Sequence, residues 1–95
     1  MSFERIKIFL FMSEIIVYSK TVCPYCVRAK MLLQRKGKKF TEIMINDEKT
    51  KNEMIKKSNG RMTVPQIFIG DQHIGGCDEL YALEAAGKLD ELFTK

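Results

Sequence analysis

The 95-residue sequence has no tryptophan, one histidine, two prolines and six glycines. With so little glycine and proline, it has no room for a long flexible linker or a low-complexity tract, and it contains no internal repeat. The apolar stretch at residues 8–11 is too short to cross a membrane and has no small-residue cleavage site before Met12. We therefore expect one small domain, with no membrane partner.

The charge balance is also modest, with a formal net charge of +4. Basic residues gather at residues 35–39 and 49–57, but acidic residues interrupt the second cluster. The first cluster coincides with the end of a predicted helix, where cations are favoured. We interpret both as solvated faces, because a nucleic-acid site usually adds aromatic residues or a recognised fold, and we expect no nucleic-acid partner.

Three cysteines cannot all pair within one chain. An odd count argues against a disulfide-stapled secreted module and fits a reducing compartment, so we expect a cytoplasmic protein. In such a compartment a C-x-x-C motif is typical of redox chemistry or metal binding.

Local patterns predict eight elements in the order β-α-β-α-β-β-α-α. Apolar, β-branched runs predict strands at residues 14–19, 40–45, 66–69 and 73–75. Helices are predicted to begin at Pro24, after residues 46–47, at residues 77–78 and at Leu89. In the first helix we expect Val27, Met31 and Leu32 to share the buried face. A helix after the first strand implies a parallel crossover, whereas a tight turn at residues 70–71 makes an antiparallel hairpin. The sequence thus predicts an α/β fold with a mixed sheet flanked by helices.

The cysteine pair lies where the first strand gives way to the first helix, in the motif Cys23-Pro24-Tyr25-Cys26. Pro24 suits the first helical position and places Cys23 at the helix mouth, where free N–H groups and the helix dipole stabilise a thiolate. The thiolate is the attacking species in disulfide exchange. Cys26 lies one turn further along the helix, within disulfide distance. We predict that Cys23 attacks and Cys26 resolves.

A structural zinc site is the alternative for this motif. The two further ligands would be His73 and Cys77, which are four residues apart with two glycines between them. This spacing differs from the second closely spaced ligand pair of a zinc knuckle. The apolar helix after Cys26 is typical of a packed core that needs no metal. We favour redox chemistry and expect no metal.

Three motifs together resemble the glutaredoxin family, specifically its dithiol bacterial members: Cys23-Pro24-Tyr25-Cys26, Thr63-Val64-Pro65 and Gly75-Gly76-Cys77-Asp78. Thioredoxins proper are less similar, since they typically carry Gly-Pro between the cysteines. The resemblance covers residues 13–92, so we assign residues 13–95 to the domain and leave residues 1–12 as an extension of uncertain role. It implies a thioredoxin-like fold with a four-stranded sheet.

The resemblance also implies the activity and the ligand. A glutaredoxin reduces protein–glutathione mixed disulfides and protein disulfides, with glutathione as co-substrate. Family precedent makes Pro65 cis and pairs the backbone of Val64 with the cysteine of glutathione. It places the γ-glutamyl end at the helix start, where N–H groups donate to a carboxylate. The glutathione-binding residues expected are Lys20, Tyr25, Thr63, Val64, Pro65, Gly76, Cys77 and Asp78, with Arg61 a further candidate.

Simpler interpretations stay open at this stage. Residues 63–65 can be a turn before a strand, and Asp78 can be a helix cap. His73 is expected on a strand without a catalytic role, and Cys77 is either a free thiol or a minor site of oxidation. Two rival functions are an iron–sulfur cluster carrier and a redoxin reduced by thioredoxin reductase. We expect a monomer whose partners are glutathione and disulfide-bonded or glutathionylated proteins.

Overall fold

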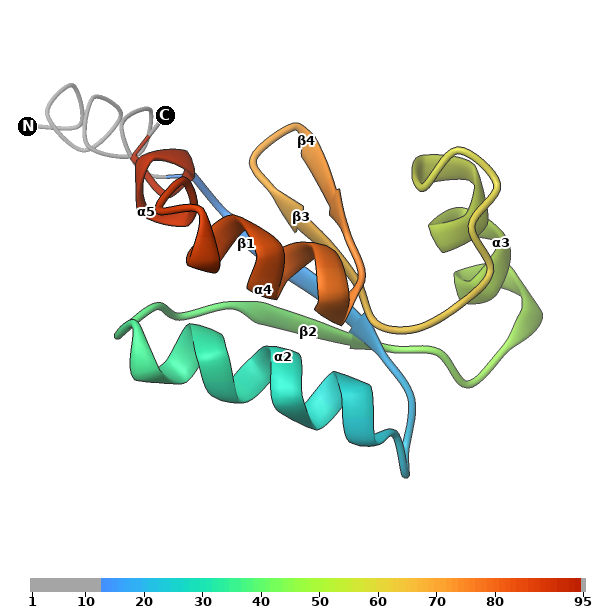
Figure 1. Cartoon of the computed structure of the whole chain (residues 1–95). Helices are drawn as coiled ribbons and strands as arrows, with labels where there is room; N and C mark the ends of the chain where they lie inside the picture. The colour runs from blue at the N-terminus through green and yellow to red at the C-terminus, as the bar shows by residue number, and fades with distance from the viewer. Residues whose placement is uncertain (1–12, 95) are drawn as a thin grey trace, which may run out of the picture.

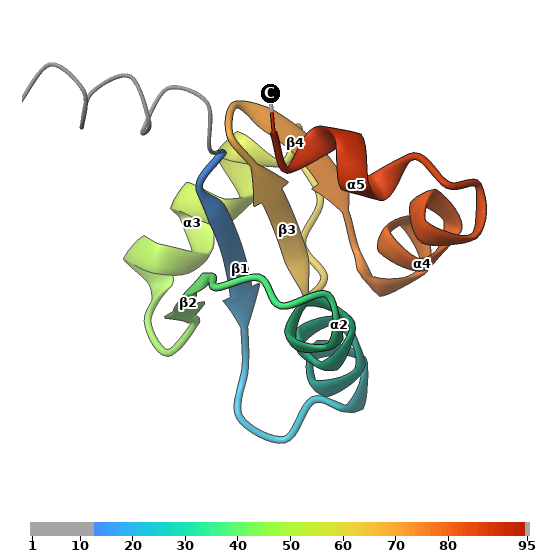
Figure 2. The same cartoon turned by 90° about the vertical axis from the view of Figure 1, so that its left-hand side faces the viewer.

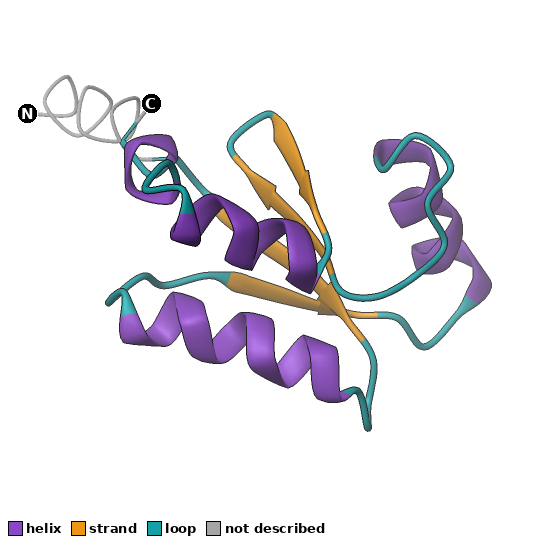
Figure 3. Cartoon of the chain, in the orientation of Figure 1, coloured by secondary structure: helices purple, strands orange, loops and turns teal. Residues whose placement is uncertain are grey.

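The computed structural model describes residues 13–94, and the predicted extension of residues 1–12 lies outside this range. All eight predicted elements are present (Figure 3). They are β1 (Ile15–Ser19), α2 (Pro24–Arg35), β2 (Thr41–Met44), α3 (Glu48–Lys57), β3 (Gln66–Ile69), β4 (Gln72–Gly75), α4 (Cys77–Ala85) and α5 (Leu89–Leu92). The predicted order is confirmed, and the bounds differ by at most a few residues.

The strands form one four-stranded sheet in the order β2-β1-β3-β4. β1 is parallel to β2 and antiparallel to β3, and β3 is antiparallel to β4, so the predicted mixed sheet is confirmed. Tyr18 is paired with Gln66, and Ile67 with Gly75. The end of β1, the start of β3 and the end of β4 therefore meet at one edge of the sheet, which is where the cysteine motif follows β1.

Helices cover both faces of the sheet, as the two views at right angles show (Figures 1 and 2). α2, α4 and α5 pack on one face over the larger apolar cluster, which includes Val17, Leu33, Ile67 and Leu80. α3 packs on the opposite face over a smaller cluster of Tyr18, Ile45, Met54 and Phe68. This three-layer arrangement buries both faces of β1 and β3, in keeping with their continuous apolar sequences.

The buried face of α2 differs from the prediction. Val27 and Met31 are 49% and 51% exposed. The buried positions are Cys26, Ala29, Leu32 and Leu33. Cys26 points into the protein beneath Cys23, so the helix is rotated about its axis and only Leu32 of the predicted face is buried. Apolar spacing alone did not distinguish the two faces because Val27 and Met31 repeat at helical spacing as well.

Capping explains where α3 begins. Asp47 is its N-cap, as one of the two predicted residues, and its Oδ1 accepts the N–H of Thr50 at 2.8 Å. This hydrogen bond lowers the pKa of the Asp47 carboxyl. Lys56 and Lys57 occupy the last turn, where positive charge interacts favourably with the helix dipole.

Candidate active site

The two cysteines of the motif form a disulfide at the start of α2, with Cα atoms 5.2 Å apart. Cys23 is the N-cap residue, and its Sγ accepts the backbone N–H of Cys26 at 3.1 Å. Pro24 occupies the first turn, as predicted. Cys23 is half-buried, whereas Cys26 is only 1% exposed. A reagent from solvent therefore meets the sulfur of Cys23 first.

The residue before the motif has an unusual backbone. Val22 has a φ of 54°, in the left-handed region that β-branched residues rarely adopt, and its side chain is 94% exposed. Sequence reasoning missed this residue, since nothing in its local pattern predicts a positive φ. The turn lets the chain leave β1 and present Cys23 at the helix mouth. Such conformations cluster at functional sites.

Val64 lies directly beside the cysteine pair. Its backbone carbonyl oxygen is 4.0 Å from the Sγ of Cys23. The peptide bond between Val64 and Pro65 is cis, which confirms the expectation from the family resemblance. Two motifs that are 41 residues apart in the chain are thus brought into contact at the sheet edge.

A shallow groove of about 340 Å³ runs from this point to the start of α4. Its size is at the lower end of the range for small-ligand pockets. The groove brings together seven of the eight expected glutathione-binding residues and the further candidate Arg61, and it adds Glu79, which was not predicted. The lining residues are Tyr25, Arg61, Thr63, Val64, Pro65, Gly76, Cys77, Asp78 and Glu79. Lys20 is exposed and does not line this groove.

The start of α4 differs from the prediction by one residue. Gly76 is the N-cap, and Asp78 is not the capping carboxylate. That role belongs to Glu79, whose Oε1 accepts the Gly76 N–H at 2.6 Å and lies 3.5 Å from Arg61. The hydrogen bond from Gly76 is the main reason that the pKa of Glu79 is lowered. The sequence contains a signal for this contact, because an acidic residue three positions after the N-cap is typical of a capping box.

The two glycines before α4 make this close contact possible. Gly75 has a φ of +114°, and a Cβ there would lie 2.8 Å from Glu79 Oε1. A Cβ on Gly76 would lie 3.3 Å from the carbonyl oxygen of Pro65. Any side chain at Gly75 would displace the Glu79 carboxylate, so the Gly-Gly pair serves the local packing whether or not a ligand is bound.

Comparison with known proteins identifies the family. The glutaredoxin family model matches residues 15–74, which is more than half of the chain. The chain belongs to the glutaredoxin family. It is 56% identical over 81 residues to glutaredoxin 3 of Escherichia coli (strain K12), covering 85% of this chain and 98% of that protein. Family members are glutathione-dependent thiol–disulfide oxidoreductases, and this chain is an enzyme of that class.

Solved structures of the family agree with the fold. The solution structure of a glutaredoxin from Brucella melitensis has a TM-score of 0.78 and 52% identity, covering 88% of this chain and 91% of that one. The crystal structure of a buckwheat glutaredoxin–glutathione complex has a TM-score of 0.77 and 31% identity, and the match covers 95% of this chain and 84% of the buckwheat chain. The predicted family, thioredoxin-like fold and enzyme class are confirmed.

Cys77, the third cysteine, is a free thiol buried at the first position of α4. Burial raises the pKa of its thiol. A protonated, buried thiol is a poor nucleophile, so Cys77 lines the groove without being suited to attack a disulfide.

The residues considered for zinc do not come together in the described part of the chain. Within residues 13–94, no group of three or more histidine, cysteine or carboxylate side chains is placed to hold a metal ion. Cys23 and Cys26 are bonded to each other, and the Nε2 atom of His73 is 2.7 Å from Gln66 Oε1. No helix in the same range is long and apolar enough to span a bilayer.

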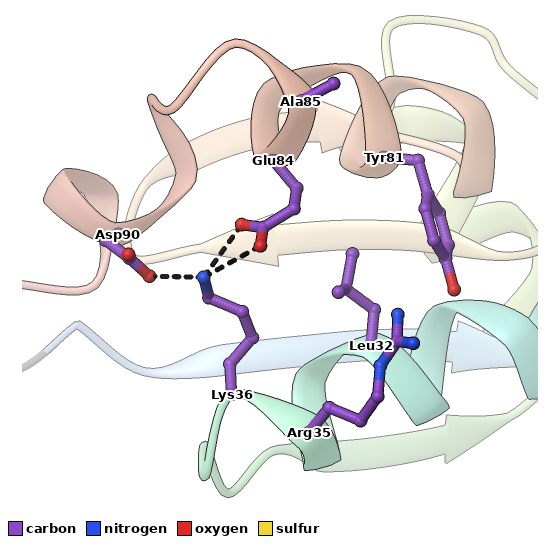
Figure 4. A pocket seen from close by; sticks show the side chains of 7 residues that line it. All are labelled: Leu32, Arg35, Lys36, Tyr81, Glu84, Ala85 and Asp90. Carbon is purple, nitrogen blue, oxygen red and sulfur yellow. Dashed lines mark hydrogen bonds and ion pairs between the residues drawn. The ribbon is translucent and has the colours of Figure 1, made fainter.

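A larger hollow of about 700 Å³ lies at the opposite end of α2 (Figure 4). Lys36 Nζ lies between two carboxylates of this hollow, 2.8 Å from Glu84 Oε1 and 2.9 Å from Asp90 Oδ1. Since an α-helix rises about 1.5 Å per residue, Lys36 is about 20 Å from Cys23. The hollow is separate from the thiols, and its ion pairs link the end of α2 to α4 and α5.

Proposed function

We propose that Cys23 is the nucleophile of the enzyme and Cys26 the resolving thiol. The observation that carries this assignment is the difference in access: Cys23 is half-buried at the helix mouth, with its sulfur beside Val64 of the groove, while Cys26 is buried. The N-terminus of α2 and the N–H of Cys26 both stabilise negative charge on Cys23 Sγ. Cys26 lies within the first turn of α2 and is buried, so a substrate disulfide cannot reach it directly.

The first route uses Cys23 alone. Its thiolate attacks the glutathione sulfur of a protein–glutathione disulfide, and the protein leaves as a thiol. A glutathione thiolate then attacks the sulfur of glutathione bound to Cys23. The products are oxidised glutathione and the regenerated Cys23 thiolate. The sulfur of the second glutathione is oxidised from thiol to disulfide, and the protein sulfur is reduced from disulfide to thiol.

The second route uses both cysteines. Cys23 attacks a protein disulfide and forms a mixed disulfide with one of its sulfurs. Cys26 then attacks Cys23 Sγ, which releases the substrate as a dithiol and leaves the Cys23–Cys26 disulfide. Two molecules of glutathione reduce this bond, because glutaredoxins as a class have potentials of about −200 to −230 mV, near the glutathione poise of the cytosol.

We propose that glutathione lies along the groove between Val64 and the start of α4. The N–H and C=O of Val64 pair with the cysteine of glutathione like one rung of an added strand, and Thr63 and Pro65 shape this rung. This pairing aligns the glutathione sulfur with Cys23 for in-line attack. Support comes from the 4.0 Å separation of Val64 O and Cys23 Sγ and from the glutathione complex of the buckwheat relative.

The two charged ends of glutathione have different partners in this proposal. Because Glu79 occupies the N–H of Gly76, the N–H groups of Cys77 and Asp78 are the donors that suit the γ-glutamyl carboxylate. The Asp78 carboxylate then faces the ammonium of the same end. At the other end, Tyr25 and Arg61 line the groove and suit the glycyl carboxylate. Lys20 contributes positive charge from outside the groove.

We also propose that the enzyme works as a monomer in the cytoplasm on glutathionylated and disulfide-bonded proteins, without a nucleic-acid partner or a resident metal. An odd cysteine number and a free buried Cys77 suit a reducing compartment. The iron–sulfur alternative predicts absorbance from a cluster after anaerobic reconstitution, together with dimer formation in sedimentation. The absence of both would remove it.

The test is glutathione-coupled reduction of a glutathionylated peptide by wild type, Cys23→Ser and Cys26→Ser. We expect turnover in wild type and Cys26→Ser and none in Cys23→Ser. Reduction of a protein disulfide should require both cysteines. Turnover by Cys23→Ser would mean that another group is the nucleophile. If thioredoxin reductase reduced the enzyme and glutathione did not, glutathione would not be the co-substrate.

A further inference from the structure

Gln66 is a buried polar residue with every amide atom in use. It is the first residue of β3 and is fully buried. Its Nε2 donates to the carbonyl oxygen of Thr63 at 2.9 Å and lies 3.2 Å from Thr63 Oγ1. Its Oε1 is 2.7 Å from His73 Nε2. A glutamine side chain has two N–H donors and one acceptor oxygen, and here each has a partner.

The orientation of this amide follows from its neighbours. The Thr63 carbonyl can only accept a hydrogen bond, so the NH₂ group of Gln66 must face it. The Gln66 oxygen then faces His73 and can only accept, so His73 Nε2 must carry a proton. The three residues form a directed chain in which His73 donates to Gln66 and Gln66 donates to Thr63.

The ring of His73 is itself held in place. It packs on Phe68 with ring centroids 4.9 Å apart, and Phe68 belongs to the core cluster under α3. Burial, followed by the charge of Arg61, lowers the pKa of His73, while Glu79 opposes this shift. The neutral Nε2–H form of the ring is therefore favoured near pH 7. The row of hydrogen bonds thus begins at His73, which packs on Phe68 of the core, and ends at Thr63 in the loop before β3.

The loop that contains Thr63 is also the loop that lies beside Cys23. Residues 61–65 lie outside helices and strands, and Thr63 is exposed. The next residue is Val64, whose carbonyl is 4.0 Å from Cys23 Sγ. One hydrogen bond from Gln66 holds the carbonyl of the peptide group between Thr63 and Val64, and the other holds the Thr63 hydroxyl. The buried amide therefore restricts how the Val64 backbone is presented to the groove.

We propose that Gln66 and His73 are positioning residues of the enzyme: through Thr63 they hold the Val64 backbone at the orientation needed to align the glutathione moiety of a disulfide substrate with Cys23. This inference rests on the proposed binding of glutathione at Val64. Neither residue touches the reacting sulfurs. Their loss changes substrate alignment and leaves the intrinsic reactivity of Cys23 intact.

The test uses two pairs of variants. Gln66→Met keeps the length of the side chain but removes both donors and the acceptor. His73→Leu removes the donor to Gln66, while His73→Gln offers an amide N–H close to the position of Nε2. Gln72→Met, at an exposed position on the same hairpin, is the matched control. Each is assayed for KM and kcat with a glutathionylated peptide, and for alkylation of Cys23 by iodoacetamide, a small reagent that needs no glutathione site.

We expect Gln66→Met and His73→Leu to raise KM for the peptide by about three- to tenfold, the range for one neutral hydrogen bond. The rate of Cys23 alkylation should stay within twofold of wild type, and His73→Gln should recover most of the loss. His73 is the single histidine of the chain, so its ¹⁵N spectrum is free of overlap. It should report the Nε2–H tautomer in wild type and lose that preference in Gln66→Met.

Failure of this inference differs from failure of the proposed function. No turnover by wild type would overturn the proposed function itself. Normal turnover in wild type with an unchanged KM in His73→Leu would overturn the positioning role. A parallel loss of alkylation and turnover would show a merely structural role and would overturn it as well. If Gln66→Met fails to fold, the comparison of His73→Leu with His73→Gln decides, since His73 is only half-buried.

Discussion

The sulfur of Cys23 accepts the backbone N–H of Cys26 at 3.1 Å, so the first cysteine of the motif caps the helix that contains the second. An N-cap residue normally uses a side-chain oxygen for this contact. Here the acceptor is the sulfur that we propose as the nucleophile. The hydrogen bond that begins α2 is therefore also one that stabilises a thiolate on Cys23 once the disulfide is reduced.

The thiols of Cys23 and Cys77 should differ sharply in reactivity. In the reduced protein at pH 7, iodoacetamide should alkylate Cys23 first. Cys77 should stay unmodified, because it is buried and burial raises its pKa. Peptide mass spectrometry of timed samples measures both sites, and denaturant supplies the control in which Cys77 becomes labelled. Labelling of Cys77 as fast as Cys23 in the native protein would contradict this.

Replacing Asp78 should weaken substrate binding. Asp78→Asn keeps the shape of the side chain but removes the charge proposed to face the ammonium of glutathione. We expect KM for a glutathionylated peptide to rise about tenfold, as for the loss of one hydrogen bond to a charged group, with little change in kcat. Asp71→Asn, an exposed position in the β3–β4 turn, is the control. An unchanged KM in Asp78→Asn would remove this residue from the site.

The carboxylate of Glu79 should stabilise the protein in a pH-dependent way. Its pKa is lowered from about 4.5 in the folded state, mainly by the Gly76 N–H, so the folded state favours the charged form. This contribution is present above the unfolded pKa and disappears as the pH falls through the folded pKa. Relative to wild type, Glu79→Gln should lose about 0.5–1 kcal/mol of unfolding free energy at pH 7.

The measurement for Glu79 is urea unfolding of both proteins between pH 7 and pH 3. The gap between them should be constant down to about pH 5 and then close. Glu53→Gln, at an exposed position within α3, should show no such gap. A difference that persists unchanged at the lowest pH would mean that the charge of Glu79 has no part in it.

Two residues of α2 test which face of the helix is buried. Leu33 is fully buried in the larger core cluster, whereas Met31 is 51% exposed. Leu33→Ala should lower the unfolding free energy by about 2–5 kcal/mol, and Met31→Ala by no more than about 0.5 kcal/mol. Denaturant unfolding measures both on the same helix. Equal losses of unfolding free energy in the two variants would mean that Met31 is buried, as the sequence predicted.

Much of the fold follows from local sequence signals. The β-branched run at β1, Pro24 at the start of α2, the Asp47 cap of α3 and the turn at residues 70–71 each act within a few residues, so each element could be placed from its own segment. The position of Cys23 at the start of α2 was predictable for the same reason, because a helix that begins directly after a strand is a local feature.

Other features depended on contacts between distant segments. Whether Val27 or Leu33 is buried depends on how α2 rotates against the sheet, and apolar spacing fits both. The Glu79 contact with Arg61 and the chain from His73 through Gln66 to Thr63 form only after β3 and β4 pair. The sequence contained these residues but no pattern that joined them.

The amino-acid sequence by itself determined the elements, the two cysteines and the family to which the chain belongs. Only the tertiary structure decided that the start of α2, the Val64 loop and the start of α4 share one groove. Local propensities and caps act over about one helical turn, whereas the three segments are joined by strand pairing. Because β3 runs antiparallel to both β1 and β4, its first residues meet their last ones, and the groove forms where these ends converge.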